Sequence, residues 1–370
     1  MSTLNFILTL VIAFAITMVL MRLLRRVACW VELVDVPGGR KTHVGEVPVI
    51  GGIAIYLGAL VAVMLTGERV SAEIEVLLAA ALMVGIGALD DRFELPPQVR
   101  IVAHLVAAVT LVLATGFRVE SLGNLLGFGD LDLGPVSFPF TVVAIIALVN
   151  AFNMLDGVDG VAGGVALVAL AGLSSSLVPA GGIAAPGTLA VVGAVVGFLV
   201  FNLPAQFNRR FLAFMGDAGS TLLGFALAGL ALVAIQPHEG GALPPAVVLW
   251  LLPVPIVELF TSTIRRLVKG ISPMQADRGH FHHRLLDAGF SVRAIFLMYV
   301  VGSSGSAVIG LAAWRAGASE ALLFGSFVGM SVLWLLGTKN ARRLVRLLPR
   351  RLRRGDFQAP ERVDAAQAKR

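Results

Sequence analysis

Long runs of uncharged, apolar residues, separated by short segments that carry the charges, constrain the fold of this chain more than any other feature. The longest run, residues 161–208, contains no Asp, Glu, Lys or Arg. A helix needs about 20 apolar residues to cross the hydrocarbon core of a bilayer. Charged residues make up only 14% of the chain, against about 25% in soluble globular domains. The sequence therefore excludes a soluble enzyme and predicts a membrane protein.

Eleven such runs predict an all-α, polytopic integral membrane protein with about 11 transmembrane helices. The uncharged stretch is divided between Pro179 and Pro186, because neighbouring Pro and Gly residues mark a turn between helices. The first run has three arginines after it and no Lys or Arg before it, which indicates a membrane anchor and not a cleaved signal peptide. The predicted spans are Leu4–Met21, Val49–Thr66, Val76–Leu89, Val99–Thr115, Phe138–Val149, Val161–Val178, Thr188–Leu203, Gly219–Ile235, Leu243–Val257, Ala294–Ala313 and Ala321–Gly337.

The distribution of Lys and Arg predicts the orientation of these spans. Of the 29 basic residues, only Arg69, Arg118 and Arg315 lie in even-numbered gaps between spans, and the other 26 lie in or beside odd-numbered gaps or in the C-terminal tail. Because cytoplasmic loops are enriched in Lys and Arg, we expect the N-terminus outside and the C-terminus in the cytoplasm. The arginine-rich tail is expected to meet anionic lipid headgroups and not nucleic acid.

The same gaps define the domain organisation. We expect one transmembrane catalytic domain over residues 1–338, followed by a basic cytoplasmic tail over residues 339–370. Polar residues concentrate in the loops that the charge rule assigns to the cytoplasm, so the chemistry is expected on that face. These loops are residues 23–48, 90–98, 150–160, 204–218 and 258–293.

Acidic and amide side chains gather at three predicted helix ends. Asp90 and Asp91 follow the third span, and Asp217 precedes the eighth. A third group, Asn150, Asn153, Asp156 and Asp159, has a spacing of three, and glycines at 157 and 160 indicate a bent segment. Adjacent carboxylates at a membrane boundary repel each other unless a cation, a proton or a positive group of the substrate compensates them. Hard oxygen ligands without thiolates favour Mg²⁺ or Mn²⁺ over zinc.

Cations and imidazoles occur in two of the same loops. Lys41 and His43 lie in the first, and a later loop brings Arg278, His280, His282 and His283 close together in sequence. Such groups can bind a diphosphate and neutralise a leaving phosphate. A zinc site on the three histidines is the alternative, although its local geometry would be cramped and it lacks a fourth nearby ligand. The single cysteine, Cys29, is expected to be a small buried apolar residue.

Four motifs in a fixed order resemble the polyprenyl-phosphate N-acetylhexosamine-1-phosphate transferases of glycosyltransferase family 4. They are Gly87-Ala-Leu-Asp90-Asp91-Arg92-Phe93, Asn150-Ala-Phe-Asn153-Met-Leu-Asp156-Gly-Val-Asp159-Gly, Phe214-Met-Gly-Asp217-Ala-Gly-Ser and Asp277-Arg-Gly-His280-Phe-His282-His283. The resemblance runs from about residue 34 to residue 290 and is strongest to the bacterial undecaprenyl-phosphate N-acetylglucosamine branch. One departure is Glu258, where an Asp is commoner in the family.

The resemblance implies a phosphotransferase of the bacterial inner membrane, with its active site facing the cytoplasm. It would transfer GlcNAc-1-phosphate from UDP-GlcNAc to undecaprenyl phosphate, giving UMP and undecaprenyl-diphosphate-GlcNAc, the first membrane step of O-antigen and related surface glycans. Another UDP-N-acetylhexosamine as donor, and a homodimer, stay open. A polytopic transporter is a further alternative, but it should show an inverted repeat with ligands at the midplane, which we do not detect.

The resemblance also suggests a role for each candidate residue. Asp217 and Asn153 would bind the Mg²⁺. Asp156 and Asp159 would hold the uridine side of the donor, with Phe214 stacked on the uracil, while Arg278 and the three histidines contact the diphosphate and the sugar. Lys41, His43 and Asn150 complete the predicted substrate-binding residues. We expect Asp90 to act as the base toward the acceptor phosphate and Asp91 as its partner, because like-charge repulsion and desolvation raise a carboxyl pKa.

Overall fold

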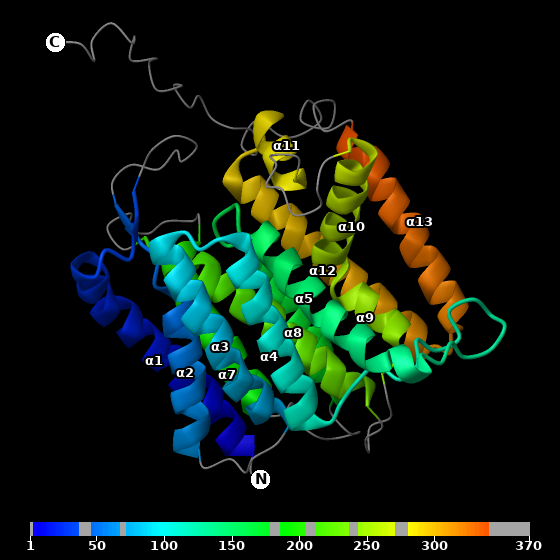
Figure 1. Ribbon diagram of the computed structural model, residues 1–370, viewed down its shortest axis with the longest axis horizontal. Helices are drawn as coiled ribbons and strands as arrows, with labels where there is room; N and C mark the ends of the chain where they lie inside the picture. The colour runs from blue at the N-terminus through cyan, green and yellow to red at the C-terminus, as the bar shows by residue number, and fades with distance from the viewer. Residues whose placement is uncertain are drawn as a thin grey trace, which may run out of the picture.

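The computed structural model describes residues 3–36, 46–66, 72–177, 186–203, 212–236, 243–270 and 280–339 of the chain, and they are almost entirely helical (Figure 1). A two-stranded antiparallel sheet, which the all-α prediction did not include, pairs Val34 with Pro48 and Asp35 with Val47. The elements are α1 Thr3–Trp30, β1 Val34–Asp35, β2 Val47–Pro48, α2 Gly51–Thr66, α3 Ala72–Phe93, α4 Pro97–Thr115, a 3₁₀ turn Gly134–Val136, α5 Ser137–Leu155, α6 Val161–Leu177, α7 Pro186–Asn202, α8 Gly216–Ile235, α9 Pro245–Leu251, α10 Pro253–Val268, α11 Phe281–Asp287, α12 Val292–Arg315 and α13 Glu320–Lys339.

Every predicted span coincides with a helix, except that the ninth is divided between α9 and α10, which meet at an angle of 92°. By length and composition, six of the described helices could cross a membrane, or seven if α9 and α10 form one span. Helices α2, α6 and α7 are apolar but shorter. These findings establish a multi-pass helical membrane protein. The number eleven and the orientation of the termini stay predictions.

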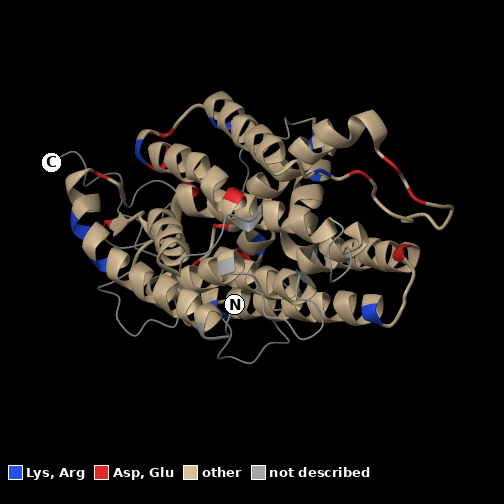
Figure 2. Cartoon of the chain, turned by 90° about the horizontal axis from the view of Figure 1, so that it is seen from below, with Lys and Arg blue, Asp and Glu red and all other residues tan. Residues whose placement is uncertain are grey.

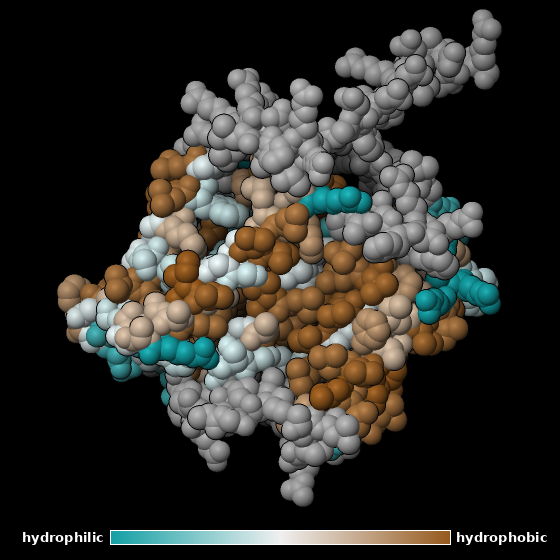
Figure 3. Space-filling view, turned by 180° about the vertical axis from the view of Figure 1, so that it is seen from behind, coloured by the Kyte–Doolittle hydropathy of each residue, from teal (hydrophilic) through white to brown (hydrophobic). Residues whose placement is uncertain are grey.

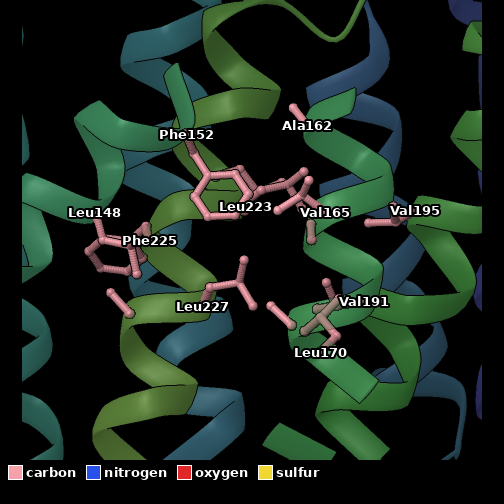
Figure 4. Packing of buried hydrophobic residues seen from close by; sticks show 14 of the residues in the cluster. Leu148, Phe152, Ala162, Val165, Leu170, Val191, Val195, Leu223, Phe225 and Leu227 are labelled. Atoms are coloured by element: carbon pink, nitrogen blue, oxygen red, sulfur yellow. The ribbon is translucent and has the colours of Figure 1, made fainter. Parts of the chain in front are cut away.

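Helix α8 occupies the centre of the molecule. It is packed against α2, α3, α5 and α6, and nearly all of its side chains are buried. Figure 4 shows Phe152 of α5 pointing toward Leu223 of α8, with Val165 of α6 beyond it. A Cβ atom added to Gly87 of α3 would overlap the backbone of Ala218, so α3 and α8 cross in close contact. This contact places the end of α3, with Asp90 and Asp91, beside the start of α8.

The peripheral helices expose apolar side chains. Met64, Leu113 and Leu333 are each about 70% exposed, and apolar residues cover much of the face in Figure 3. Cys29 is also exposed, so the predicted burial of its side chain is wrong. The reason is that α1 lies at the edge of the molecule and packs mainly on α2 and α7, which leaves its other face uncovered.

Candidate active site

Three segments that are far apart in the sequence meet at the start of α8. The carboxylate of Asp91 accepts hydrogen bonds from the backbone N–H groups of Asp217, at 2.7 Å, and Ala218, at 3.1 Å. A carboxylate at this position is favourable because the first N–H groups of a helix have no partner within the helix and carry partial positive charge. Gly216 precedes them with φ +73°, and a Cβ atom there would overlap Val49 and crowd the Asp91 carboxylate. The glycine in this motif is therefore required for the approach of α3.

Asn153 joins the cluster from α5. Its amide Nδ2 donates to Oδ1 of Asp217 at 2.7 Å and to Oγ of Ser220 at 3.2 Å. The two residues predicted to bind a metal are thus adjacent. This contact orders the Asp217 carboxylate beside the Asn153 amide.

Arg100 connects the carboxylate of Asp90 to the cluster. This arginine was not identified as a site residue from the sequence. Its Nη1 atom lies 2.9 Å from Oδ2 of Asp90 and 3.6 Å from Oδ2 of Asp217. The other oxygen of Asp90, Oδ1, accepts a hydrogen bond from the backbone N–H of Leu95 at 2.8 Å. A signal did exist, because Arg100 is the one charged residue inside the predicted span Val99–Thr115, and a charge within such a segment indicates function.

The carboxylates repel one another and are poorly solvated. Asp91 lies beyond the predicted third span, and burial raises its pKa to about 7. The nearby Asp217 contributes to this rise, while the two backbone N–H donors oppose it. Burial also raises the pKa of Asp156 well above its ordinary value, with further contributions from Asp217, Asp91 and Asp159. Together with Asp90, five carboxylates therefore interact across one small region, and a bound cation would relieve their repulsion.

The residues present fit a magnesium ion. Among the described residues no group of three His, Cys, Asp or Glu side chains is arranged to hold a metal. Mg²⁺ does not need such a cage, because it keeps several waters and is bound through one or two carboxylates together with substrate phosphates. A carboxylate paired with an amide, as in Asp217 and Asn153, is a hard oxygen donor set of this kind. In the described part of the chain, His280, His282 and His283 likewise do not form a metal-holding group, which gives no support to the zinc alternative.

A turn between α5 and α6 carries the next two predicted residues, Asp156 and Asp159. Asn202, at the end of α7, fastens this turn, because its Oδ1 accepts from the N–H of Gly160 at 2.7 Å and its Nδ2 donates to the carbonyl of Ala213 at 2.9 Å. Asn202 therefore links the turn to the segment before α8. Nothing in its sequence neighbourhood distinguishes it from other residues of a long uncharged run.

Phe214 is held by its backbone next to β2. Its N–H donates to the carbonyl of Pro48 at 2.9 Å, and its own carbonyl accepts from Gly51 at 3.0 Å. Asn150 behaves differently, since its side-chain amide donates to the carbonyl of Ile146 one turn earlier in α5. The described hydrogen bonds thus bring Asn153 into the cluster and leave Asn150 on its own helix.

The segment that carries His280, His282 and His283, called here the histidine segment, contacts the same turn. Stacked rings of His280 and His282 lie 5.7 Å apart, and the ring of His283 is 4.3 Å from that of His282. A Cβ atom on Gly157 would overlap Nε2 of His282, which is why the turn carries glycine there. Burial, with smaller contributions from the charges of His283 and His280, lowers the pKa of His282 to about 3, so this imidazole is neutral near pH 7.

Glu258 of α10 anchors this segment. Its carboxylate accepts from the backbone N–H of Phe281, at 3.1 and 3.3 Å, and from the hydroxyl of Tyr299 at 3.1 Å. The N–H of Phe281 is the first of α11, whose preceding residue, His280, supplies no side-chain cap. Glu258 is 4% exposed, and it joins α10, α11 and α12. Three further predicted residues, Lys41, His43 and Arg278, lie outside the described residues.

Comparison with known proteins adds independent support. The sequence profile of glycosyl transferase family 4 matches residues 74–235, a segment that contains Asp91, Asn153 and Asp217. The chain is 33% identical to an undecaprenyl-phosphate alpha-N-acetylglucosaminyl 1-phosphate transferase of Yersinia pestis over 349 residues, which are 93% of this chain and 94% of that protein. It is 33% identical to the protein of the same name from Haemophilus influenzae, over 90% and 93% of the two chains. It is 32% identical to the protein of the same name from Escherichia coli O157:H7, over 95% of this chain and 96% of that protein. With this coverage, and with the acidic cluster inside the matched segment, the chain belongs to glycosyl transferase family 4.

Proposed function

We propose that this protein transfers GlcNAc-1-phosphate from UDP-GlcNAc to undecaprenyl phosphate, as the first membrane step in the assembly of a surface glycan. One observation carries the proposal: a single cluster at the ends of apolar helices is formed by Asp91, Asn153, Asp217 and Arg100. The relatives that are named for this activity align with the chain over more than nine-tenths of their own length. A charged cluster at a membrane boundary suits a reaction between a soluble nucleotide sugar and a lipid phosphate.

In this reaction an oxygen of the acceptor phosphate attacks the phosphorus that carries the sugar. The bond between the two phosphates of the donor breaks, and UMP leaves with the bonding electron pair. Such a transfer requires mainly positioning and neutralisation of charge, so no Ser or Cys nucleophile is needed. Asp217 and Asn153 would hold Mg²⁺, which supplies charge neutralisation on the diphosphate when bound. Arg100 adds a fixed positive charge 3.6 Å from Asp217.

The donor is expected to span the two sides of the turn between α5 and α6. Asp156 and Asp159 would hold the uridine side, Phe214 would stack on the uracil, and Arg278 with the three histidines would contact the diphosphate and sugar. Asp159→Ala and Phe214→Ala should each raise the KM for the UDP-sugar, because they remove binding that is present in both ground and transition states. An unchanged KM in both variants would contradict this placement.

The reaction is tested with purified protein in detergent, undecaprenyl phosphate, Mg²⁺ and a panel of radiolabelled UDP-sugars. Release of UMP together with a labelled lipid diphosphate, resolved by thin-layer chromatography, is the expected result with UDP-GlcNAc. A labelled lipid only with a different UDP-N-acetylhexosamine would keep the reaction and replace the donor. No UMP release with any of them would overturn the proposal, and the names of the relatives give no support to the alternative of a transporter.

We also propose eleven spans in the inner membrane, with the N-terminus outside and the acidic cluster facing the cytoplasm. The asymmetry of 26 against three basic residues supports this orientation. A reporter fused after Arg370 should score cytoplasmic, and one inserted near Gly181 should score external. Both reporters on one side of the membrane would rule out the eleven-span arrangement.

A further inference from the structure

A loop that the proposed function does not use, residues 116–136, joins α4 to α5 on the face opposite the acidic cluster. Arg100 lies in the first turn of α4 and Asn153 in the last turn of α5, so the loop connects the far ends of both helices. Helix α4 has 19 residues, which corresponds to a length of about 28 Å. We propose that the tip of this loop inserts into the bilayer interface on that face and fixes the loop to the lipid.

The tip presents apolar side chains outward. Phe128 is 91% exposed, the highest value among large apolar residues in the described part of the chain, and Leu126 is 53% exposed. Their neighbour Leu125 instead packs against the core. Glycines on both sides of Phe128, Gly127 and Gly129, have φ of +83° and +118°, a backbone conformation that other residues rarely adopt. The turn therefore separates one partly buried leucine from two exposed apolar side chains.

Hydrogen bonds hold the loop in one conformation. Leu122 and Leu131 are linked through the bond from Leu122 N–H to the Leu131 carbonyl at 3.0 Å, and Leu133 N–H donates to the carbonyl of Glu120 at 2.8 Å. The N–H of Asn124 donates to the carboxylate of Glu320, the first residue of α13, at 2.9 Å. These bonds lie at the base of the loop, so the protein itself fixes where the apolar tip is presented.

The position of the loop favours lipid as the partner. Figure 1 shows the loop reaching sideways past the first turn of α13, and in Figure 2 it stands clear of the helices, with acidic residues along it. Glu320 ties the loop to this turn, and on the same helix Leu322 and Leu333 are 62% and 70% exposed. The apolar tip thus continues a helix surface that faces lipid.

The charges of the loop are compatible with this arrangement. Asp130 and Asp132, which follow the tip, are exposed and can stay in the hydrated headgroup region while Phe128 enters the boundary with the acyl chains. Trp, Phe and Leu are typical of surfaces that bury into the boundary between headgroups and acyl chains. The next most exposed large apolar residues, Trp30 at 84% and Val268 at 82%, end α1 and α10 on the opposite face. Both faces of the molecule therefore carry strongly exposed apolar residues at helix ends or loops.

Site-directed spin labelling tests the insertion. In a Cys29→Ser background, Phe128→Cys and the matched control Asp130→Cys are labelled in nanodiscs of phosphatidylethanolamine and phosphatidylglycerol. Collision of each label with oxygen, which concentrates in lipid, is compared with collision with a polar nickel chelate. The ratio of oxygen to nickel collisions should be several-fold higher at position 128 than at position 130. Glu320→Ala, which removes the acceptor for the Asn124 N–H, should increase the mobility of the label at 128.

Equal access of the nickel chelate to both labels would place the tip in water and overturn the proposal. Dipolar broadening between labels on separate molecules would overturn it in favour of contact with a second copy. Both labelled proteins should keep the wild-type rate of UMP release, because positions 128 and 130 lie far from the cluster. This control separates failure of the insertion from failure of the proposed activity.

Discussion

Asp91 accepts a hydrogen bond of 2.7 Å from the backbone N–H of Asp217, so two carboxylate residues from different motifs are joined by backbone and not by their charges. The Asp91 carboxylate thereby fixes the first turn of α8, from which the Asp217 side chain projects. A second bond, from the N–H of Ala218 at 3.1 Å, makes the contact bidentate. We infer that Asp91 sets the position of Asp217 in addition to any contact it makes with substrate.

Replacing Asp91 with Asn should therefore disturb the site more than its conservative shape suggests. The amide offers one acceptor oxygen in place of two and no negative charge to the start of α8. We expect Asp91→Asn to lower kcat by about 100-fold or more, a loss similar to that caused by removing one positioned donor from an active site. The measurement is UMP release at saturating donor. Asp132→Asn, on the opposite face, is the matched control and should keep the wild-type rate.

Asp90 and Arg100 are expected to act as one unit. Both Asp90 oxygens are engaged, one by Arg100 at 2.9 Å and one by the Leu95 N–H. Asp90→Asn and Arg100→Gln should each lower kcat by about 100-fold, and the double variant should be no worse than the single ones, because coupled residues are not additive. Arg118→Gln, which removes an exposed arginine on the other face, should have no effect.

The role of Asp90 as a base is tested by the pH dependence of the same variant. The second pKa of a phosphate monoester is about 6, so the acceptor is fully ionised near pH 9 and needs no base there. If Asp90 removes a proton, Asp90→Asn should recover much of its activity at pH 9. If Asp90 instead acts only electrostatically, through its ion pair with Arg100, Asp90→Asn should lose the same share of activity at pH 7 and at pH 9. The ion pair leads us to expect this second result. Full activity of Asp90→Asn at pH 7 would exclude both the base role and the electrostatic role.

Metal dependence should report on Asn153 and Asp217. Chelation of divalent cations should abolish turnover, and added Mg²⁺ should restore it. Asp217→Ala should have no measurable activity. Asn153→Ala removes a proposed ligand and also the hydrogen bond that orders Asp217, so this variant should need about 10-fold more Mg²⁺ for half-maximal rate. Asn150→Ala is a matched control on the same helix, and its Mg²⁺ requirement should be unchanged. A normal rate of Asp217→Ala at limiting Mg²⁺ would remove this residue from the metal site.

The apolar runs predicted the helices well, because each is long enough to be read without knowledge of its neighbours. They also predicted that the motifs with Asp91, Asn153 and Asp217 lie at helix ends on one face, and the structure brings these three residues into contact. What each carboxylate contacts could not be predicted. Successive residues of a helix point about 100° apart, so Asp90 turns toward Arg100 of α4 while Asp91 turns toward α8, and only the packing of these helices decides which is which.

Residues whose partners are distant in sequence were also missed. Asn202 is 42 positions from Gly160 and lies in an uncharged run, where one amide gives no periodic or compositional signal. Arg100 was counted only as a basic residue beside a cytoplasmic gap. The exposure of Cys29 depends on α1 being peripheral, a property of the helix arrangement that residue preferences do not contain.

Glu258 should prove to be a positioning residue for the histidine segment. Glu258→Ala removes the acceptor for the Phe281 N–H and leaves that donor buried, so we expect a higher KM for the UDP-sugar and a free energy of unfolding lower by about 1–3 kcal/mol. Glu258→Gln keeps an acceptor oxygen and should restore most of the binding. Tyr299→Phe, which removes only the second contact, should give an intermediate KM. Equal KM values in wild type and Glu258→Ala would contradict the positioning role, and Glu120→Ala controls for loss of a surface acid.

The neutral state of His282 should make the stability of the protein depend on pH. In the folded protein burial lowers the pKa of His282 from 6.5 to about 3, so between these values the unfolded chain binds a proton that the folded one does not. The free energy of unfolding should then fall as the pH drops below about 6.5, with a slope of at most about 1.4 kcal/mol per pH unit. Thermal unfolding in detergent from pH 7 to pH 4 measures this slope, to which carboxylates also contribute. His282→Gln should therefore show a smaller slope than the wild type over the same range. An identical slope in wild type and His282→Gln would show that this imidazole is already protonated or solvated in the fold.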